Sequence, residues 1–390
     1  MRYNTQRRLL TILRNILKQT IVPALGLLFS WVITNKFSLD LWGQVAKISL
    51  WVGIITHISA WGNGQYLLKE FSAKPANLKA LWQKCLMGRL PVLLITSVCV
   101  IIYFRNTMGM VIAAWCIIEY IYESYEPLIV YHKKFVISVW AEITGAIVLF
   151  FFLFLFRANV NAGLVISLLM LADLSKTLVV ILYFSKSLFP FKIQKPDLGY
   201  YVGSITFFLL SFVGLIEARA DLIYVTTYLG HKEIAFYQIA TTFFLFTKGG
   251  ASMLILPFVP AIYRINKNRI HKLSFRFTAM GIALSLSAFI AIYFILTIGY
   301  KFQVGFPFML FGFLSIIPAF YSYTLITFLF KEHKQNKVLI YGLISILVNL
   351  SCSALLIPAF GTLGAIIAAA IAQWVIIPLY LYEMGLVKVV

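Results

Sequence analysis

Charged residues inside long apolar segments are the feature of this sequence that can do chemistry. Lys47, Arg219 and Lys248 each stand as a solitary cation within an apolar run, and Arg14 and Lys18 lie where the first run begins. Ammonium and guanidinium groups donate charge-assisted hydrogen bonds to phosphate oxygens. We therefore expect these five residues to bind an anionic substrate.

Acidic residues occupy the same kind of segment. Glu217 and Asp221 are four residues apart and share a helical face, whereas Arg219 points roughly the other way. Glu119 and Glu123 also fall on one face. Because carboxylates in an apolar environment are costly and are retained where protons or cations move, Asp221, Glu217, Glu119 and Glu123 are candidates for ion coupling.

The same acids allow a structural interpretation. Glu126 continues the acidic stripe, which can pair with basic residues of neighbouring loops, and Glu142 can belong to the same cluster. Asp173 and Lys176 are three residues apart and can pair across one helical turn. For these residues we favour structural ion pairs.

The composition indicates which elements must position these side chains. The chain has 390 residues, of which 61% are hydrophobic and 12% charged, whereas soluble domains are about 25% charged. A run of about 20 apolar residues spans a bilayer as a helix. We therefore predict an all-α membrane protein with about twelve transmembrane helices. The expected spans are 13–34, 42–61, 86–104, 108–130, 136–156, 163–184, 202–226, 234–258, 277–298, 305–329, 338–358 and 363–383.

The net charge of +20 is typical of a membrane protein here and not of a protein that binds nucleic acid. The basic residues recur between the apolar runs instead of forming one patch. Most of them fall in alternate loops, which places both termini in the cytoplasm by the positive-inside rule. The longest loop is expected around 62–85, on the cytoplasmic side, where Arg89 is counted with its basic residues.

The chain also divides into halves. Ser185–Asp197 contains two prolines and three lysines and separates six expected spans from six. A faint repeat relates residues 41–46 to residues 235–240. We predict an N-terminal six-helix lobe over 1–192 and a C-terminal six-helix lobe over 193–390.

Three motifs resemble one family in particular. They are Ala220-Asp221-Leu222-Ile223-Tyr224 with Tyr228-Leu229-Gly230 and Phe236-Tyr237-Gln238-Ile239-Ala240; Asn349-Leu350 with Leu356-Ile357-Pro358, Gly361 and Gly364-Ala365; and Trp61-Gly62-Asn63-Gly64-Gln65-Tyr66-Leu67-Leu68-Lys69. Together they are similar to the O-antigen flippases of the multidrug/oligosaccharidyl-lipid/polysaccharide exporter superfamily. The glycine that usually precedes the tyrosine of span eight is replaced by Ala235-Phe236.

The resemblance implies a fold and a cargo. Spans one, two, seven and eight would line a central cationic cavity. The cargo would be a polyprenyl-pyrophosphate oligosaccharide, carried to the outer leaflet of a bacterial inner membrane by alternating access. The expected partners are this lipid, the bilayer, and a polysaccharide polymerase with its assembly proteins; nucleic acid is not a partner. We expect no cofactor and no metal site, because the four cysteines form no CxxC pair.

A lipid II flippase is a related alternative that we disfavour, because such proteins often carry extra spans and the three motifs fit them less well. Two further alternatives stay open. A multidrug exporter of the same superfamily would favour an acidic cavity, which three isolated cations oppose. An O-antigen polymerase or ligase would need a large outer loop with catalytic His or Arg residues, and the expected outer loops are short.

Overall fold

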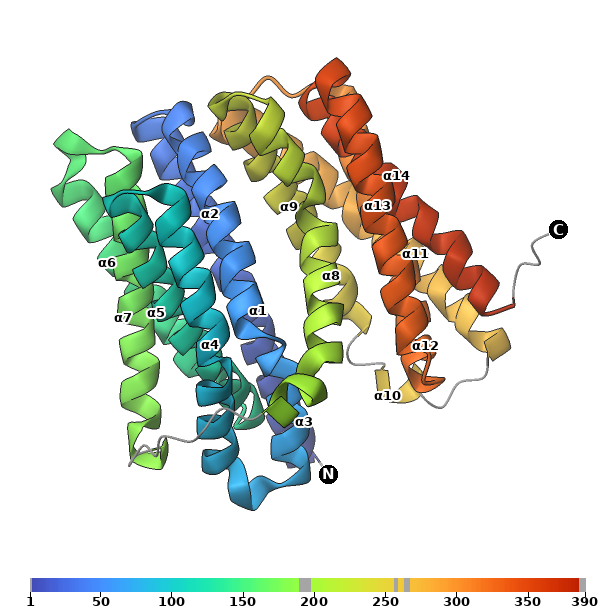
Figure 1. Ribbon diagram of the computed structural model, residues 1–390. Helices are drawn as coiled ribbons and strands as arrows, with labels where there is room; N and C mark the ends of the chain where they lie inside the picture. The colour runs from blue at the N-terminus through green and yellow to red at the C-terminus, as the bar shows by residue number, and fades with distance from the viewer. Residues whose placement is uncertain (1, 189–197, 256–258, 263–266, 386–390) are drawn as a thin grey trace. The chain divides into compact units, whose positions relative to one another are not determined.

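The computed structural model describes residues 2–188, 198–255, 259–262 and 267–385, and these ranges are helical without a strand (Figure 1). The twelve long helices are α1 (Arg2–Lys36), α2 (Leu39–Ala60), α4 (Leu78–Phe104), α5 (Thr107–Tyr131), α6 (Phe135–Leu155), α7 (Ala162–Leu188), α8 (Leu198–Tyr228), α9 (His231–Ile255), α11 (Lys267–Phe294), α12 (Phe306–Lys331), α13 (Gln335–Phe360) and α14 (Thr362–Glu383). The short elements are α3 (Asn63–Ala73), α10 (Val259–Ile262), the 3₁₀ turns η1 (Pro75–Asn77) and η2 (Arg157–Asn159), and the π-helical turn η4 (Ile295–Gly299).

The predicted all-α membrane fold is confirmed. Among the described residues, 10 helical segments are long and apolar enough to cross a membrane, one of them joining α2 and α3. The other two long helices are α5 and α9, and polar content sets them apart. Helix α5 carries Glu119, Glu123 and Glu126, and α9 carries Lys248. The two helices that look least like membrane spans therefore bear several of the candidate site residues.

Two expectations about the first half are wrong. The segment 62–85 is not a loop, because α3 fills most of it and α4 already begins at Leu78. Arg89 consequently lies inside α4 and is fully buried. The expected break near 105–107 is correct: Arg105 ends α4 with a left-handed φ of 51°, and the Asn106 side chain caps α5 by accepting a hydrogen bond from the Met108 amide at 3.1 Å.

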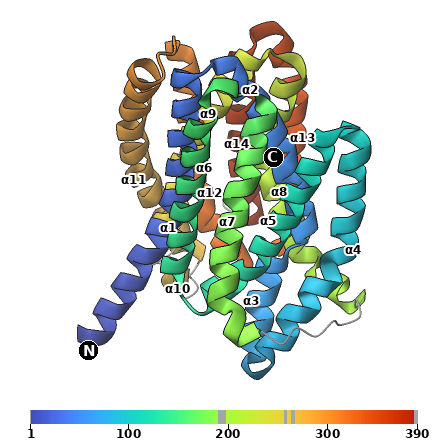
Figure 2. The same cartoon turned by 90° about the vertical axis from the view of Figure 1, so that its left-hand side faces the viewer.

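Contacts divide the chain into two compact units, and each has its own core. Unit 1 comprises Met1–Leu28 and Lys47–Phe212. In it, α3 packs on α4 and α5, α4 packs on α5, and α7 packs on α5 and α6; Figure 2 shows α6 and α7 running alongside each other. Its core includes the fully buried Leu67, Phe71, Leu128 and Val180.

Unit 2 comprises Phe29–Ala46 and Val213–Val390. Here α12 packs on α9, α11 and α14, and α13 runs beside α14 (Figure 1). Ile255, Ile270 and Leu325 are fully buried in its core. Helices α1, α2 and α8 are thus each shared between the units. The lobes predicted over 1–192 and 193–390 stay a prediction.

Two glycines of unit 2 allow close approach between elements. A Cβ added to Gly43 of α2 would lie 1.8 Å from the carbonyl oxygen of His231, where α9 begins. A Cβ added to Gly364 would lie 2.1 Å from the carbonyl oxygen of Leu356, across the turn between α13 and α14. Both positions therefore require glycine if the helices are to pack this closely.

Candidate functional site

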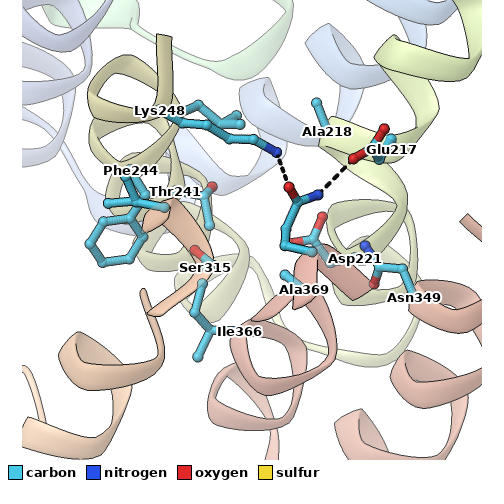
Figure 3. Close-up of a pocket in the computed structure, with 13 residues that line it drawn as sticks. Glu217, Ala218, Asp221, Thr241, Phe244, Lys248, Ser315, Asn349, Ile366 and Ala369 are labelled. Atoms are coloured by element: carbon cyan, nitrogen blue, oxygen red, sulfur yellow. Dashed lines mark hydrogen bonds between the residues drawn. The ribbon is translucent and has the colours of Figure 1, made fainter. Parts of the chain in front are cut away.

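Glu217 and Asp221 of α8 line one small pocket of unit 2, as their spacing predicts (Figure 3). Lys248 of α9 lines the same pocket, and its long side chain enters from the opposite side in Figure 3. The structure therefore brings together one cation and two acids from two consecutive helices. This polar pocket is the candidate site of unit 2.

Gln373 of α14 connects the cation to one of the acids. Lys248 Nζ donates to Gln373 Oε1 at 2.7 Å, and Gln373 Nε2 donates to Glu217 Oε1 at 2.7 Å (Figure 3). A side-chain amide offers one acceptor and two donors, so it can satisfy an ammonium and a carboxylate together. Lys248 is thus held without a direct ion pair. The sequence gives no sign of this role for Gln373, because nothing in an isolated Gln indicates a partner 125 residues away.

Asp221 has a different partner. Its carboxylate accepts a hydrogen bond from the Tyr237 hydroxyl, and both residues are buried. Thr241, Ser315 and Asn349 add further oxygen atoms to the same wall. The cavity measures only about 50 Å³, which admits a few waters or a small ion. In this conformation it is far too small for a diphosphate headgroup.

Arg219 and Lys47 do not line this pocket. Arg219 is half-buried on another face of α8, and it makes no hydrogen bond or ion pair with the described part of the chain. Lys47 is exposed on the section of α2 that belongs to unit 1. Their assignment to substrate binding stays a prediction.

The two basic candidates of α1 differ in environment. Arg14 is exposed, whereas Lys18 forms an ion pair with Glu126 of α5. Glu126 thus takes the structural role that the sequence analysis favoured for the acidic stripe. Lys18 can reach a substrate only if this pair opens, which weakens the case for it as a binding residue.

Glu119 approaches an ion network rather than a cavity. Lys176 Nζ lies 2.7 Å from Asp173 Oδ1, as predicted for residues three apart, and 2.9 Å from Glu142 Oε2. Trp115 Nε1 also donates to Asp173 at 2.6 Å, and the Glu119 carboxyl interacts with Asp173. The expected grouping of Glu142 with the stripe was therefore incomplete: its ion pair is with Lys176 of α7.

Arg89 is the largest fully buried side chain in the described chain. Its Nη2 donates to Ser124 Oγ at 2.6 Å, its Nη1 donates to the Ala60 carbonyl at 3.3 Å, and its guanidinium lies 4.6 Å from the centre of the Tyr120 ring. These contacts tie α4 to α2 and α5. In the sequence, Arg89 is a basic residue at the edge of an apolar run. Basic residues of cytoplasmic loops occur at the same kind of position, so the sequence does not distinguish the two.

Glu123 lines a second cavity, in unit 1. Asn63 and Gln65 at the start of α3, and Ser211 of α8, line the same cavity. The three acids of α5 therefore have three different environments. Glu119 interacts with Asp173, Glu123 lines this cavity, and Glu126 forms an ion pair with Lys18.

Comparisons with known proteins give likenesses of structure. No protein-family model and no curated protein matches the sequence. The lipid II flippase MurJ in an inward-closed conformation superposes with a TM-score of 0.75 at 11% identity, covering 97% of this chain and 87% of that one. An inward-facing multidrug-resistance MATE transporter of the MOP superfamily gives 0.67 at 11% identity, covering 96% and 98%. The eukaryotic MATE transporter AtDTX14 gives 0.55 at 12% identity, covering 97% and 94%.

Proposed function

We propose, from the fold that this chain shares with a lipid II flippase and with MATE transporters of the MOP superfamily, that it is a lipid flippase. The cargo is a polyprenyl-pyrophosphate oligosaccharide, the repeat unit of a surface polysaccharide such as O-antigen. It moves from the cytoplasmic to the outer leaflet of a bacterial inner membrane by alternating access, with both termini in the cytoplasm. The single observation that carries the proposal is the likeness to the lipid II flippase over 97% of the chain.

The charge pattern supports a diphosphate-bearing cargo. Burying a diphosphate in the hydrocarbon without partners costs far more than ordinary binding offsets. Isolated cations on membrane helices lower this cost through charge-assisted hydrogen bonds. Arg219, Lys248 and Lys47 are the proposed partners of the phosphates. Arg219 is the strongest of the three, because it is half-buried and makes no ion pair within the described chain.

The narrow pocket of unit 2 supports ion coupling. Asp221 and Glu217 face a space of ion size, and Lys248 is held at the same pocket through Gln373. A cation that binds the two carboxylates would compete with this bridge and release Lys248 toward the cargo. Asp221 and Glu217 are therefore the proposed coupling residues, whereas the contact of Glu119 with the Asp173 network favours a structural role for Glu119.

A multidrug exporter is the second candidate. It is favoured by the two carboxylates of this pocket, which suit a cationic drug, and by the likeness to the MATE transporter. The two functions predict that different compounds accumulate when the protein is depleted. Depletion of a flippase leaves lipid-linked oligosaccharide on the cytoplasmic leaflet, while depletion of a drug exporter leaves intracellular drug.

Depletion in the native bacterium tests the proposal. We expect undecorated cell surface and a build-up of polyprenyl-pyrophosphate oligosaccharide in lipid extracts, with unchanged sensitivity to cationic drugs. Normal surface polysaccharide together with increased drug sensitivity would reject the flippase and favour the exporter.

A further inference from the structure

A cavity of about 280 Å³ lies inside unit 1, apart from the polar pocket of unit 2. Its walls come from the end of α2, the start of α3, Glu123 of α5, and Phe207 and Ser211 of α8. Small-molecule sites usually measure about 300–1,000 Å³. The volume of this cavity therefore suits one small group, such as a single sugar ring.

The first N–H groups of α3 lie at the wall of this cavity. The first four N–H groups of a helix have no intrahelical acceptor. In α3, the Tyr66 amide donates to the Gly62 carbonyl at 3.2 Å, while Gly64 and Gln65, which precede it, line the cavity. Gly62 has a φ of 66°, which turns the chain sharply into the helix. The positive end of the α3 dipole therefore lies at the cavity wall.

Asn63 is the second, independent observation. It lines the cavity and is 1% exposed, yet neither Oδ1 nor Nδ2 has a hydrogen-bond partner in the described chain. An unpaired buried polar group costs about 1–3 kcal/mol. Such a group is retained where a ligand or bound water completes it. Both amide atoms are closed to a molecule the size of water in this conformation, so a ligand reaches this donor and acceptor when the Asn63 side chain turns toward the cavity.

Glu123 supplies the opposing acceptor. Its carboxylate makes no hydrogen bond or ion pair with the described residues, although it lies within electrostatic range of Glu126, which repels it, and of Arg89 and Lys18, which attract it. His57 and Ser211 complete the polar wall and are joined by a contact of 3.2 Å between Nε2 and Oγ. The cavity thus presents the N–H groups of a helix start on one side and, on the other, a carboxylate without a hydrogen bond or ion pair to the described residues.

This combination selects hydroxyl groups. An anion would be repelled by Glu123, and a simple cation would leave the N–H groups of α3 unpaired and face the positive end of the helix. A hydroxyl both donates and accepts, so neighbouring hydroxyls satisfy Glu123, Asn63 and the helix terminus together. The ring of Phe207 adds an apolar surface against which a sugar face can pack.

We propose that this cavity, lined by Asn63, Glu123 and the start of α3, is a subsite for one monosaccharide unit of the cargo. The proposal rests on the proposed flippase function, because it names the part of the cargo that this unit recognises. Glu123 is thereby assigned to a sugar hydroxyl rather than to ion coupling.

Direct binding of free sugars tests the subsite without any transport. Purified protein in detergent is titrated with glucose, galactose, rhamnose and N-acetylglucosamine, and bound sugar is detected by saturation-transfer NMR, with glycerol as the non-sugar polyol. We expect saturable binding of at least one of these sugars. Glu123→Gln should weaken it by about tenfold, as for loss of a hydrogen bond to a charged group. The matched change Glu70→Gln, in α3 but outside the cavity lining, should leave binding unchanged.

A cavity-filling variant distinguishes loss of the sugar site from misfolding of the protein. A Cβ at Gly64 meets no atom within 4 Å, so Gly64→Leu places a side chain in the open space and should abolish sugar binding without lowering the melting temperature. Gly26 of α1 is equally unobstructed and lies outside the cavity, so Gly26→Leu is the control and should bind normally. Absence of sugar binding to the unmodified protein, or equal binding by Gly64→Leu, would mean that the cavity holds water only and would overturn the subsite.

The proposed subsite and the proposed flippase function can be rejected independently of each other. If no sugar binds but depletion still causes lipid-linked oligosaccharide to accumulate, the subsite is rejected and the flippase stands. If depletion has no effect on that lipid, the flippase is rejected whatever the sugars do.

Discussion

The ammonium of Lys248 and the side-chain amide of Gln373 are joined by a hydrogen bond of 2.7 Å, and the same amide donates to Glu217 at 2.7 Å. The amide therefore holds a cation and an anion in one pocket without letting them neutralise each other directly. Such an arrangement can be opened by any ligand that competes for either end. The polar pocket is thus better described as a switchable contact than as a fixed ion pair.

Lys248→Met should impair transport more than stability. The substitution keeps much of the length of the side chain and removes the charge, so a charge-assisted contact worth about 2 kcal/mol is lost, which corresponds to about 30-fold in rate or affinity. Surface polysaccharide and the melting temperature of the purified protein are the two measurements. Lys232→Met is the control, because Lys232 is exposed at the start of the same helix. Equal loss in both variants would contradict a specific role for Lys248.

Arg219→Ala should abolish surface polysaccharide while leaving the protein in the membrane, because the half-buried guanidinium makes no hydrogen bond or ion pair within the described chain. Arg219→Lys should retain part of the activity, since it keeps the charge but not the planar donor array. Arg157→Ala, at an exposed residue of η2, should have no effect. Immunoblots of membranes and of extracted polysaccharide report both quantities, and normal polysaccharide in Arg219→Ala would reject its role.

A charge exchange separates the two roles of Lys18. Lys18→Glu and Glu126→Lys should each lower activity and melting temperature, because each places two like charges together. The double exchange restores an ion pair of opposite polarity. Recovery of both activity and stability in the double variant is expected if Lys18 is structural. Recovered stability with lost activity would instead support the original assignment of Lys18 to substrate binding.

Lys176→Met should destabilise unit 1 strongly. Lys176 is the cation between Glu142 and Asp173, whose side chains are 8% and 10% exposed. Removing one partner of a buried ion pair costs about 3–5 kcal/mol, because the remaining charge is left unpaired. Adding Glu142→Gln to Lys176→Met should recover part of the loss in thermal unfolding. Lys74→Met, which removes the exposed pair with Glu70, should change stability by less than about 1 kcal/mol, and a similar effect in both would contradict the network.

The sequence predicted what depends on local spacing and missed what depends on distant contacts. Asp173 and Lys176 pair as their three-residue spacing requires, and Glu217 and Asp221 share a face for the same reason. Glu142 is in the same network, but its position relative to α7 is set by helix packing that no spacing encodes. Gln373 was missed because a neutral amide carries no signal of its own.

Arg89 shows how a correct general rule fails at one residue. Basic residues at the ends of apolar runs usually lie in cytoplasmic loops, and Arg89 was interpreted in that way. The expected span 86–104 already contains Arg89, but its full burial depends on acceptors supplied by Ala60 and Ser124, which the sequence does not reveal. Acceptors from neighbouring helices, such as Ala60 and Ser124, allow a basic residue to lie inside an apolar helix.

Translocation by the purified protein is the most direct test of the proposed function. The protein is reconstituted into liposomes that contain a fluorescent polyprenyl-pyrophosphate saccharide, and a membrane-impermeant quencher measures how fast the lipid changes leaflet. We predict transfer well above that of empty liposomes, and transfer near the background level for Arg219→Ala and Lys248→Met. Transfer at the rate of empty liposomes by intact protein, with uptake of the cationic drug ethidium in the same vesicles, would contradict the flippase.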